Sequence, residues 1–174
     1  MKARIPLPIP AQMSAEQRRI YDDVLRTRPN ASGPFLAWLH SPGLAQPAQA
    51  LGAFCRYRTS LDLQESELLI LCVAAAYRCP GEQQIHEPIA REAGLSEQVV
   101  VAIRSGAVAE LPTARLRMLA EIAGELCTTK RLSPALFQRA GQLFDTAALV
   151  EIVGVIGYYA FVAYTLNAFE MSPA

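Results

Sequence analysis

Residues 63–95 decide the fold, and they read LQESELLILCVAAAYRCPGEQQIHEPIAREAGL. Asp62, just before this stretch, and Glu65 within it form a capping box, which is a sequence signature of a helix start. The residues that follow are apolar almost without interruption as far as Tyr77. A helix that is apolar on every side has to be covered on every side. We therefore predict a helix over 63–77 at the centre of the fold.

The second half of the same stretch predicts a return helix. Cys79, Pro80 and Gly81 interrupt the apolar pattern and favour a turn. Residues 82–93 then regain helical spacing, and Gly94 stands where a helix C-terminus prefers glycine. The two helices are thus expected to form a hairpin.

Helical signals also fill the rest of the chain. Cap residues, prolines at first helical positions and apolar residues at helical spacing predict further segments, while strand alternation, repeats and low-complexity tracts are missing. The predicted fold is an all-α, single-domain helical bundle over 14–174, preceded by an extended, proline-rich arm over 1–13. The further segments are helices over 14–28, 42–57, 96–106, 112–127, 133–144 and 146–169, and a short helical turn within 33–42.

Composition limits which binding partners and which cellular compartment we expect. The 174 residues include 16 basic and 16 acidic side chains without a basic block, so we expect no nucleic-acid partner. The prolines near the N-terminus leave no continuous apolar region of a secretory signal. We therefore expect a cytoplasmic protein with reduced thiols.

The C-terminal helix is unusually apolar. Its run from Ile152 to Leu166 is shorter than the roughly 18 to 20 residues that span a bilayer. Glu151 closes one end, and no basic residue follows Arg139. We expect a buried helix rather than a membrane span. Since a small monomer covers such a helix poorly, we also expect a homo-oligomer.

Metal and cofactor motifs are sparse. The four cysteines show no CxxC pair, and the two histidines are His40 and His86. Phosphate-binding, dinucleotide-binding and zinc-protease motifs are missing as well. We expect neither a metal nor a cofactor, although His40, His86 and a carboxylate could in principle make a two-histidine metal site.

Chemistry concentrates in the return helix. Glu82 and His86 are four residues apart and share a helix face, so the carboxylate can orient the imidazole, or the two can act as acid and base. The same spacing also fits an ordinary exposed ion pair. Cys79 lies at the start of this helix, where the helix dipole favours a thiolate.

These residues also support a family resemblance. The sequence resembles the carboxymuconolactone decarboxylase and alkylhydroperoxidase-D-like (AhpD-like) family over nearly its whole length. This resemblance implies an AhpD-like helical bundle, a trimer or hexamer, and action on a small molecule. The residues that carry it are Gly33, Pro34 and Phe35, Leu39 to Pro42, Glu67 to Leu71, Glu82 and His86, and Ala90, Gly94 and Leu95.

The resemblance also implies site residues. The related AhpD enzymes carry a glutamate, eleven residues, a CxxC pair, three residues and a histidine, and the matching positions here are Glu67, Cys79, Glu82 and His86. Glu82 replaces the second cysteine, so a mechanism that forms a disulfide within the CxxC pair is not available. At 1.5 Å per residue, Glu67 lies about 18 Å before Cys79 along the first helix and His86 about 10 Å after it along the second. The two residues need not therefore lie side by side across the hairpin.

Three functions remain open from the sequence. The first is acid–base proton transfer on a small carboxylated lactone or related carboxylate, as the decarboxylase branch of the family implies. The second is a one-cysteine peroxidase that uses Cys79, with His86 as its base and an external thiol as resolver. The third is a non-catalytic oligomer that binds a ligand or partner.

Overall fold

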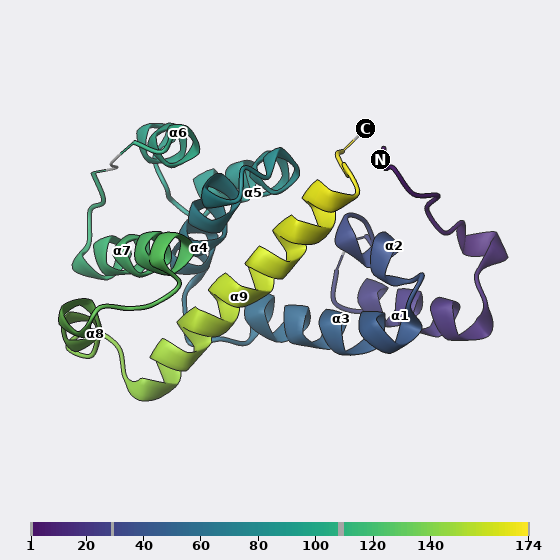
Figure 1. Ribbon diagram of the computed structural model, residues 1–174, viewed down its shortest axis with the longest axis horizontal. Helices are drawn as coiled ribbons and strands as arrows, with labels where there is room; N and C mark the ends of the chain where they lie inside the picture. Colours follow the sequence, from purple (N-terminus) through teal and green to yellow (C-terminus); the bar gives the residue numbers. More distant parts are fainter. Residues whose placement is uncertain (1, 29, 108–109, 174) are drawn as a thin grey trace. The chain divides into compact units, whose positions relative to one another are not determined.

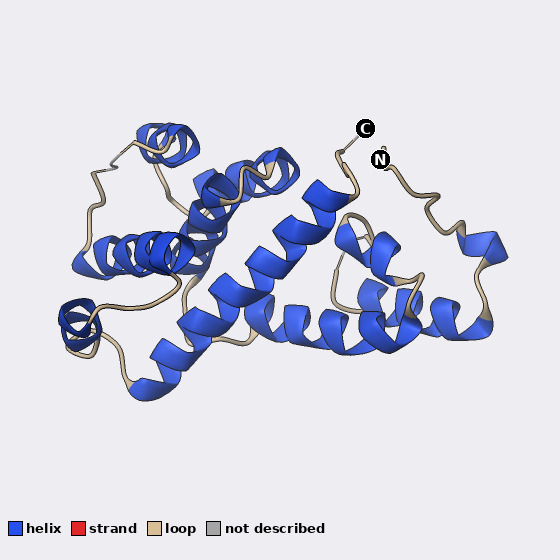
Figure 2. Ribbon diagram, viewed as in Figure 1, coloured by secondary structure: helices blue, strands red, loops and turns tan. Residues whose placement is uncertain are grey.

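The computed structural model describes residues 2–28, 30–107 and 110–173, so Met1 and Ala174, the outermost residues of the predicted arm and domain, lie outside it. Its regular elements are helices (Figures 1 and 2), which confirms the predicted all-α fold. The helices are α1 (Ala15–Leu25), α2 (Pro34–Trp38), α3 (Pro42–Tyr57), α4 (Leu63–Ala76), α5 (Pro80–Glu92), α6 (Glu97–Ser105), α7 (Ala114–Thr129), α8 (Pro134–Ala140) and α9 (Thr146–Ala168), with a 3₁₀ turn at Pro10–Gln12.

Backbone contacts divide this domain into two compact units. One unit comprises residues 1–58 and 164–174, and the other comprises residues 59–163. The long helix α9 contributes its residues up to 163 to the second unit and its last turn to the first. The candidate site residues all belong to the second unit.

The second unit is organised around α4. Leu68, Leu69 and Ile70 are fully buried, as the apolar run predicts, and α5, α6 and α7 pack against this helix. The capping box of Asp62 and Glu65 is formed as predicted. Glu65 is 5% exposed and accepts a hydrogen bond from Nη2 of Arg115 on α7 at 3.1 Å. The cap thus starts the helix and also joins α4 to α7.

The hairpin turn is tighter than predicted. Helix α5 begins at Pro80 rather than at residue 82, because proline has no N–H to lose at the first helical position. Arg78 adopts a left-handed backbone conformation with φ of +49°, and the amide of Cys79 donates to the carbonyl of Ala74 at 2.8 Å. The turn therefore brings α4 and α5 together over only three residues, 77–79.

The first unit ties the N-terminal arm to the C-terminus. Lys2 pairs with Ser172 in an isolated antiparallel bridge. His40 places Nε2 at 2.7 Å from the carbonyl oxygen of Pro6. In the same unit the indole N–H of Trp38 donates to the hydroxyl of Thr165 at 3.0 Å. His40 is therefore engaged by the arm of its own chain.

Helix α9 is long and apolar enough to cross a bilayer by length and composition alone. However, Ile152, Val155 and Ala163 are fully buried within the protein, which is typical of a core helix in a soluble protein. Along the same helix Val150 and Val153 are 67% and 48% exposed. The prediction of a helix buried on all sides is thus right for one face and wrong for the other.

Candidate functional site

Glu67 and His86 meet across the hairpin. Nδ1 of His86 lies 2.8 Å from Oε2 of Glu67, and the residues are 7% and 0% exposed. Our doubt that they would be level was misplaced. Along α4, Glu67 is about 14 Å from the helix end at Ala76, and along α5, His86 is about 9 Å from the helix start at Pro80. The difference of about 5 Å is short enough for a glutamate side chain to span.

Glu82 completes a carboxylate–imidazole–carboxylate arrangement. It lies in the first turn of α5, is 4% exposed, and places Oε2 at 3.3 Å from Nε2 of His86. The predicted pair four residues apart is thus present, and it is buried rather than solvated. Each ring nitrogen of His86 therefore faces a carboxylate, one from α4 and one from its own helix.

These carboxylates decide the charge of the imidazole. Burial lowers the pKa of His86, but the hydrogen bond to Glu67 and the nearby negative charges of Glu82 and Glu67 outweigh burial and raise the pKa from 6.5 to about 9. At neutral pH His86 is therefore an imidazolium that donates from Nδ1 to Glu67. The protonated ring is the acid of the arrangement.

Cys79 differs from the sequence-based prediction. It is the N-cap residue of α5, and the backbone N–H groups of Gly81 and Glu82 act on its sulfur and lower its pKa. Burial of the thiol and the charge of Glu82 act in the opposite direction, and the net effect is a raised pKa. The predicted thiolate is therefore wrong: the helix N-terminus is present, but the buried thiol keeps its proton.

Sequence reasoning missed Tyr159. Its ring, on α9, meets the imidazole of His86 edge to face, with centroids 5.6 Å apart, and it packs in the same way against Tyr158. Tyr159 is only 6% exposed, so it helps to keep water from the imidazolium. The only signal in the sequence was a pair of tyrosines inside an otherwise aliphatic run.

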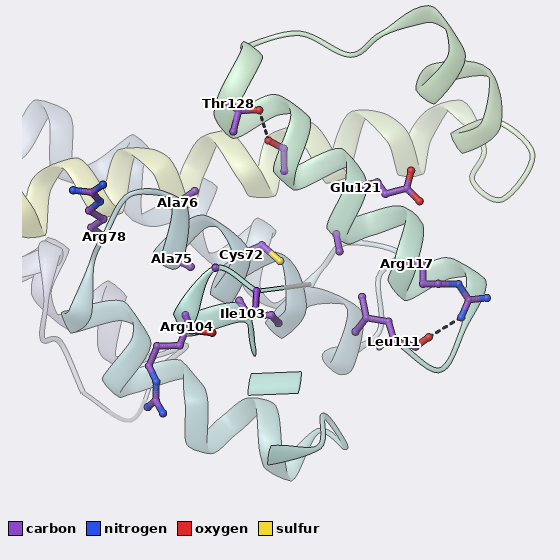
Figure 3. A pocket seen from close by; sticks show the side chains of 15 residues that line it. Cys72, Ala75, Ala76, Arg78, Ile103, Arg104, Leu111, Arg117, Glu121 and Thr128 are labelled. Carbon is purple, nitrogen blue, oxygen red and sulfur yellow. Dashed lines mark hydrogen bonds between the residues drawn. The ribbon is translucent and has the colours of Figure 1, made fainter. Parts of the chain in front are cut away.

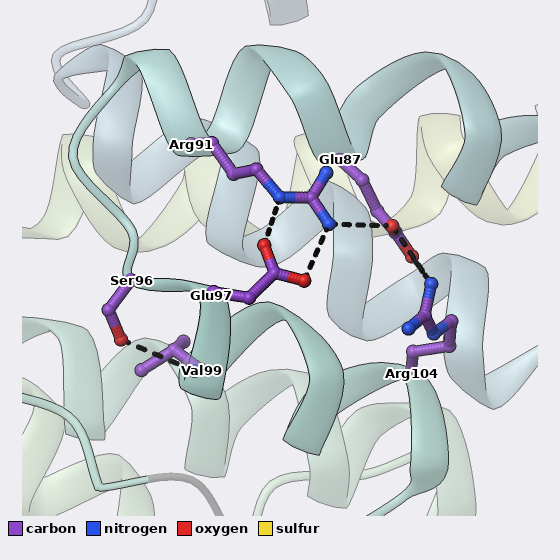
Figure 4. A network of polar contacts seen from close by, with 6 residues as sticks. All are labelled: Glu87, Arg91, Ser96, Glu97, Val99 and Arg104. Carbon is purple, nitrogen blue, oxygen red and sulfur yellow. Dashed lines mark hydrogen bonds and ion pairs between the residues drawn. The ribbon is translucent and has the colours of Figure 1, made fainter.

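Glu87, next to His86 in sequence, does not join the site. It is 7% exposed, and its carboxylate is bound by Arg91 of the same helix at 3.2 Å and by Arg104 of α6 at 3.1 Å (Figure 4). Arg91 also binds Glu97 at the start of α6. This network joins α6 to α5. It also neutralises the buried carboxylate of Glu87, so that Glu87 adds no net charge near His86.

The second unit also contains a cavity of about 810 Å³ that is distinct from this site. One wall is formed by Cys72, Ala75 and Ala76 of α4 with Arg78 of the turn that follows, and the rest by residues of α6 and α7 together with Gly106, Ala107 and Leu111 (Figure 3). Glu67, Cys79, Glu82 and His86 are not among its lining residues.

The metal alternative gains no support from geometry. Within residues 2–28, 30–107 and 110–173, no group of three or more His, Cys, Asp or Glu side chains is arranged to hold a metal ion. His40 and His86, the pair that a two-histidine site would need, have separate partners in Pro6 and Glu67.

The helical hairpin with its buried glutamates and histidine is part of an all-α protein with the AhpD-like fold. The sequence model of the carboxymuconolactone decarboxylase family matches residues 42–125, which include α3 to α6 and all four site residues. Over this stretch the chain is similar to that family. None of the curated proteins matches the sequence closely enough to count as a relative.

Solved structures share the fold at low sequence identity. A peroxidase-related protein from Ralstonia eutropha JMP134, described as having an alkylhydroperoxidase AhpD core, is 18% identical over 99% of this chain and 92% of its own, with a TM-score of 0.83. A peroxidase-related protein from Silicibacter sp. TM1040 is 16% identical with the same coverage and a TM-score of 0.81. The debrominase Bmp8 is 14% identical over 92% and 87%, with a TM-score of 0.74.

Proposed function

We propose that this chain is an acid–base enzyme, a decarboxylase-like lyase that transfers a proton on a small organic molecule. The observation that carries the proposal is the imidazolium of His86 between two buried carboxylates. In this role His86 is the general acid, Glu82 is the base beside it, and Glu67 positions the ring through Nδ1. The family provides decarboxylation of a small carboxylated lactone as the first reaction to test.

The proton balance of such a reaction is simple. Loss of carbon dioxide from a carboxylated lactone leaves an electron pair on carbon, as a carbanion or enolate. Nε2 of His86 donates its proton to that position, and the electron pair of the former N–H bond stays on the imidazole. Solvent then returns a proton to the ring, which the raised pKa favours.

A second function, peroxide reduction by Cys79, is supported by a different observation. The sulfur lies at the start of α5 with two backbone N–H groups acting on it, and two structural neighbours are described as peroxidase-related. The thiolate would attack the O–O bond, giving sulfenic acid and an alcohol, and external thiols would restore it. The raised pKa of Cys79 makes this reaction slower at neutral pH, so we rank it second.

One panel of assays separates these functions. Carboxylated lactones and hydroperoxides are given to the wild type, Cys79→Ser and His86→Ala. We expect lactone turnover in the wild type and in Cys79→Ser, and none in His86→Ala. Peroxide consumption that disappears with Cys79→Ser would instead establish the second function.

The assembly and the compartment belong to the same proposal. We infer a homo-oligomer, a trimer or hexamer as the family resemblance implies, working in the cytoplasm on a small-molecule substrate. The exposed valines of α9 support assembly, since apolar side chains on a core helix favour a partner surface.

A further inference from the structure

One oxygen of the site has no hydrogen bond. Oε2 of Glu82 is inaccessible to solvent, and among the residues the structure describes no donor meets it with hydrogen-bond geometry. The N–H of His86 is 3.3 Å away, which is close enough for charge attraction but is not directed at this oxygen. Buried carboxylate oxygens rarely remain in this state, and an unsatisfied one in a native protein calls for an explanation.

The two carboxylates of the site are not equivalent. Oε2 of Glu67 already accepts the Nδ1 proton of His86 at 2.8 Å, and the side chain of Glu67 is fully buried. The side chain of Glu82 keeps 6% of its surface exposed, and that of His86 keeps 9%. Of the three side chains, those of Glu82 and His86 therefore keep some contact with solvent, whereas that of Glu67 has none.

The charge of the site limits what that molecule can be. Two carboxylates face one imidazolium, so the group carries one surplus negative charge. Among the neighbouring groups, the thiol of Cys79 is protonated, Tyr159 meets His86 with its ring, and Arg91 and Arg104 are bound to Glu87. An anionic group brought next to Glu82 would be repelled at low dielectric, whereas a neutral donor would be attracted.

We propose that Glu82 Oε2 receives the hydrogen-bond donor of an uncharged substrate group, an O–H or N–H weak acid such as an enol, phenol or azole. This inference rests on the proposed function, because it assigns the substrate class of the same site. Any carboxylate of the substrate then lies away from Glu82. The donor proton also comes within reach of the Glu82–His86 pair, which is where proton transfer would occur.

Three probes of similar size and different polar group test the proposal. These are para-chlorophenol, its methyl ether and para-chlorobenzoate, titrated into the wild-type protein at neutral pH by calorimetry. We expect the phenol to bind about tenfold more tightly than the ether, which is the effect of one hydrogen bond of about 1.4 kcal/mol. We expect the benzoate to bind most weakly.

Two matched variants locate the effect. Glu82→Gln and Glu67→Gln remove the same charge from the same site, but only Glu82→Gln removes the carboxylate that we assign as acceptor. In Glu82→Gln the preference for phenol over ether should weaken, because an amide oxygen accepts a weaker hydrogen bond than a carboxylate, and benzoate binding should improve, because the amide can also donate. In Glu67→Gln the preference for phenol should remain.

The comparison in the wild type needs no variant, so the proposal stays testable even if a variant fails to fold. Equal affinity for phenol and ether, tighter binding of benzoate, or no saturable binding of the phenol would overturn it. A phenol preference of unchanged size in Glu82→Gln would also overturn it. If the phenol is preferred but no lactone is turned over, the proposed function fails and this inference stands. If lactone is turned over but the phenol is not preferred, this inference fails and the proposed function stands.

Discussion

At the scale of single residues, His86 has two properties that rarely coexist. It is almost fully buried, which opposes charge, and it is protonated at neutral pH, because carboxylates contact both of its nitrogens. A strong local interaction therefore maintains a buried cation, and the protein depends on that interaction for stability as well as for chemistry.

The first prediction concerns stability. In His86→Leu, Glu67 stays fully buried but loses the donor on Nδ1, and breaking a buried ion pair by removing one member costs about 3 to 5 kcal/mol. Adding Glu67→Met should restore most of this loss, because the buried charge is then removed as well. Urea unfolding of the single and double variants measures both effects. A double variant no more stable than His86→Leu would show that the pair does not interact as described.

The second prediction concerns pH. Since folding raises the pKa of His86 from 6.5 to about 9, protonation stabilises the folded state. This contribution, on the order of 3 kcal/mol, is fully present below pH 6.5 and is lost as pH rises through 9. The stability difference between wild type and His86→Leu should therefore shrink from about pH 6 to about pH 10. A difference that grows over this range would mean that His86 is buried neutral.

The site could be predicted only in part from the sequence. The spacing of Glu82 and His86 predicted their pairing, because helix geometry fixes residues four apart. Glu67 came from the family resemblance, since contact across a turn depends on where each helix ends. The protonation of Cys79 and the position of Tyr159 depend on what buries them, and burial by a distant segment leaves no local pattern.

At the scale of elements, cap residues predicted that a helix is present more accurately than the sequence predicted where each helix begins. The capping boxes at Ser14 and Asp62 are present, and Gly94 takes the positive φ expected after a helix. The start of α5 was placed two residues late, because Pro80 was read as an interruption rather than as a first helical residue. Proline serves both purposes, and only the course of the chain after it distinguishes them.

The third prediction uses two glycines. Gly94 and Gly106 have φ of +99° and +72°, but a Cβ at Gly94 would lie 2.9 Å from Nε2 of Gln64, whereas nothing lies within 4 Å of one at Gly106. Gly106→Ala should cost about 1 to 2 kcal/mol for its left-handed backbone, and Gly94→Ala clearly more. Thermal unfolding compares them. Equal losses would mean that Gln64 moves aside freely.

At the scale of the whole molecule, α9 leaves an apolar face uncovered. Val150 and Val153 lie on this exposed face, Ile152 and Val155 of the same helix are fully buried, and the two glycines on the exposed face, Gly154 and Gly157, have open space above them. The sequence predicted an apolar helix, but it could not show which face remains uncovered, because the helix is apolar all round.

The fourth prediction is that this face is buried between copies of the chain. Light scattering should give a mass that is a multiple of 19.0 kDa, and Val153→Glu should reduce it. Val101 on α6, 40% exposed, provides the matched control, and Val101→Glu should leave the mass unchanged. A wild-type mass of a single chain would contradict the proposed assembly.

The account as a whole depends on a charged imidazole held by Glu67 and Glu82, and nitrogen-15 NMR of the two histidines measures it most directly. His40 is exposed, and the His86→Leu variant assigns the signals. We predict that both nitrogens of His86 carry protons at neutral pH and that the ring titrates with a pKa of about 9 in the wild type and a lower one in Glu67→Gln. A neutral ring at pH 7, titrating at or below 6.5, would contradict the account.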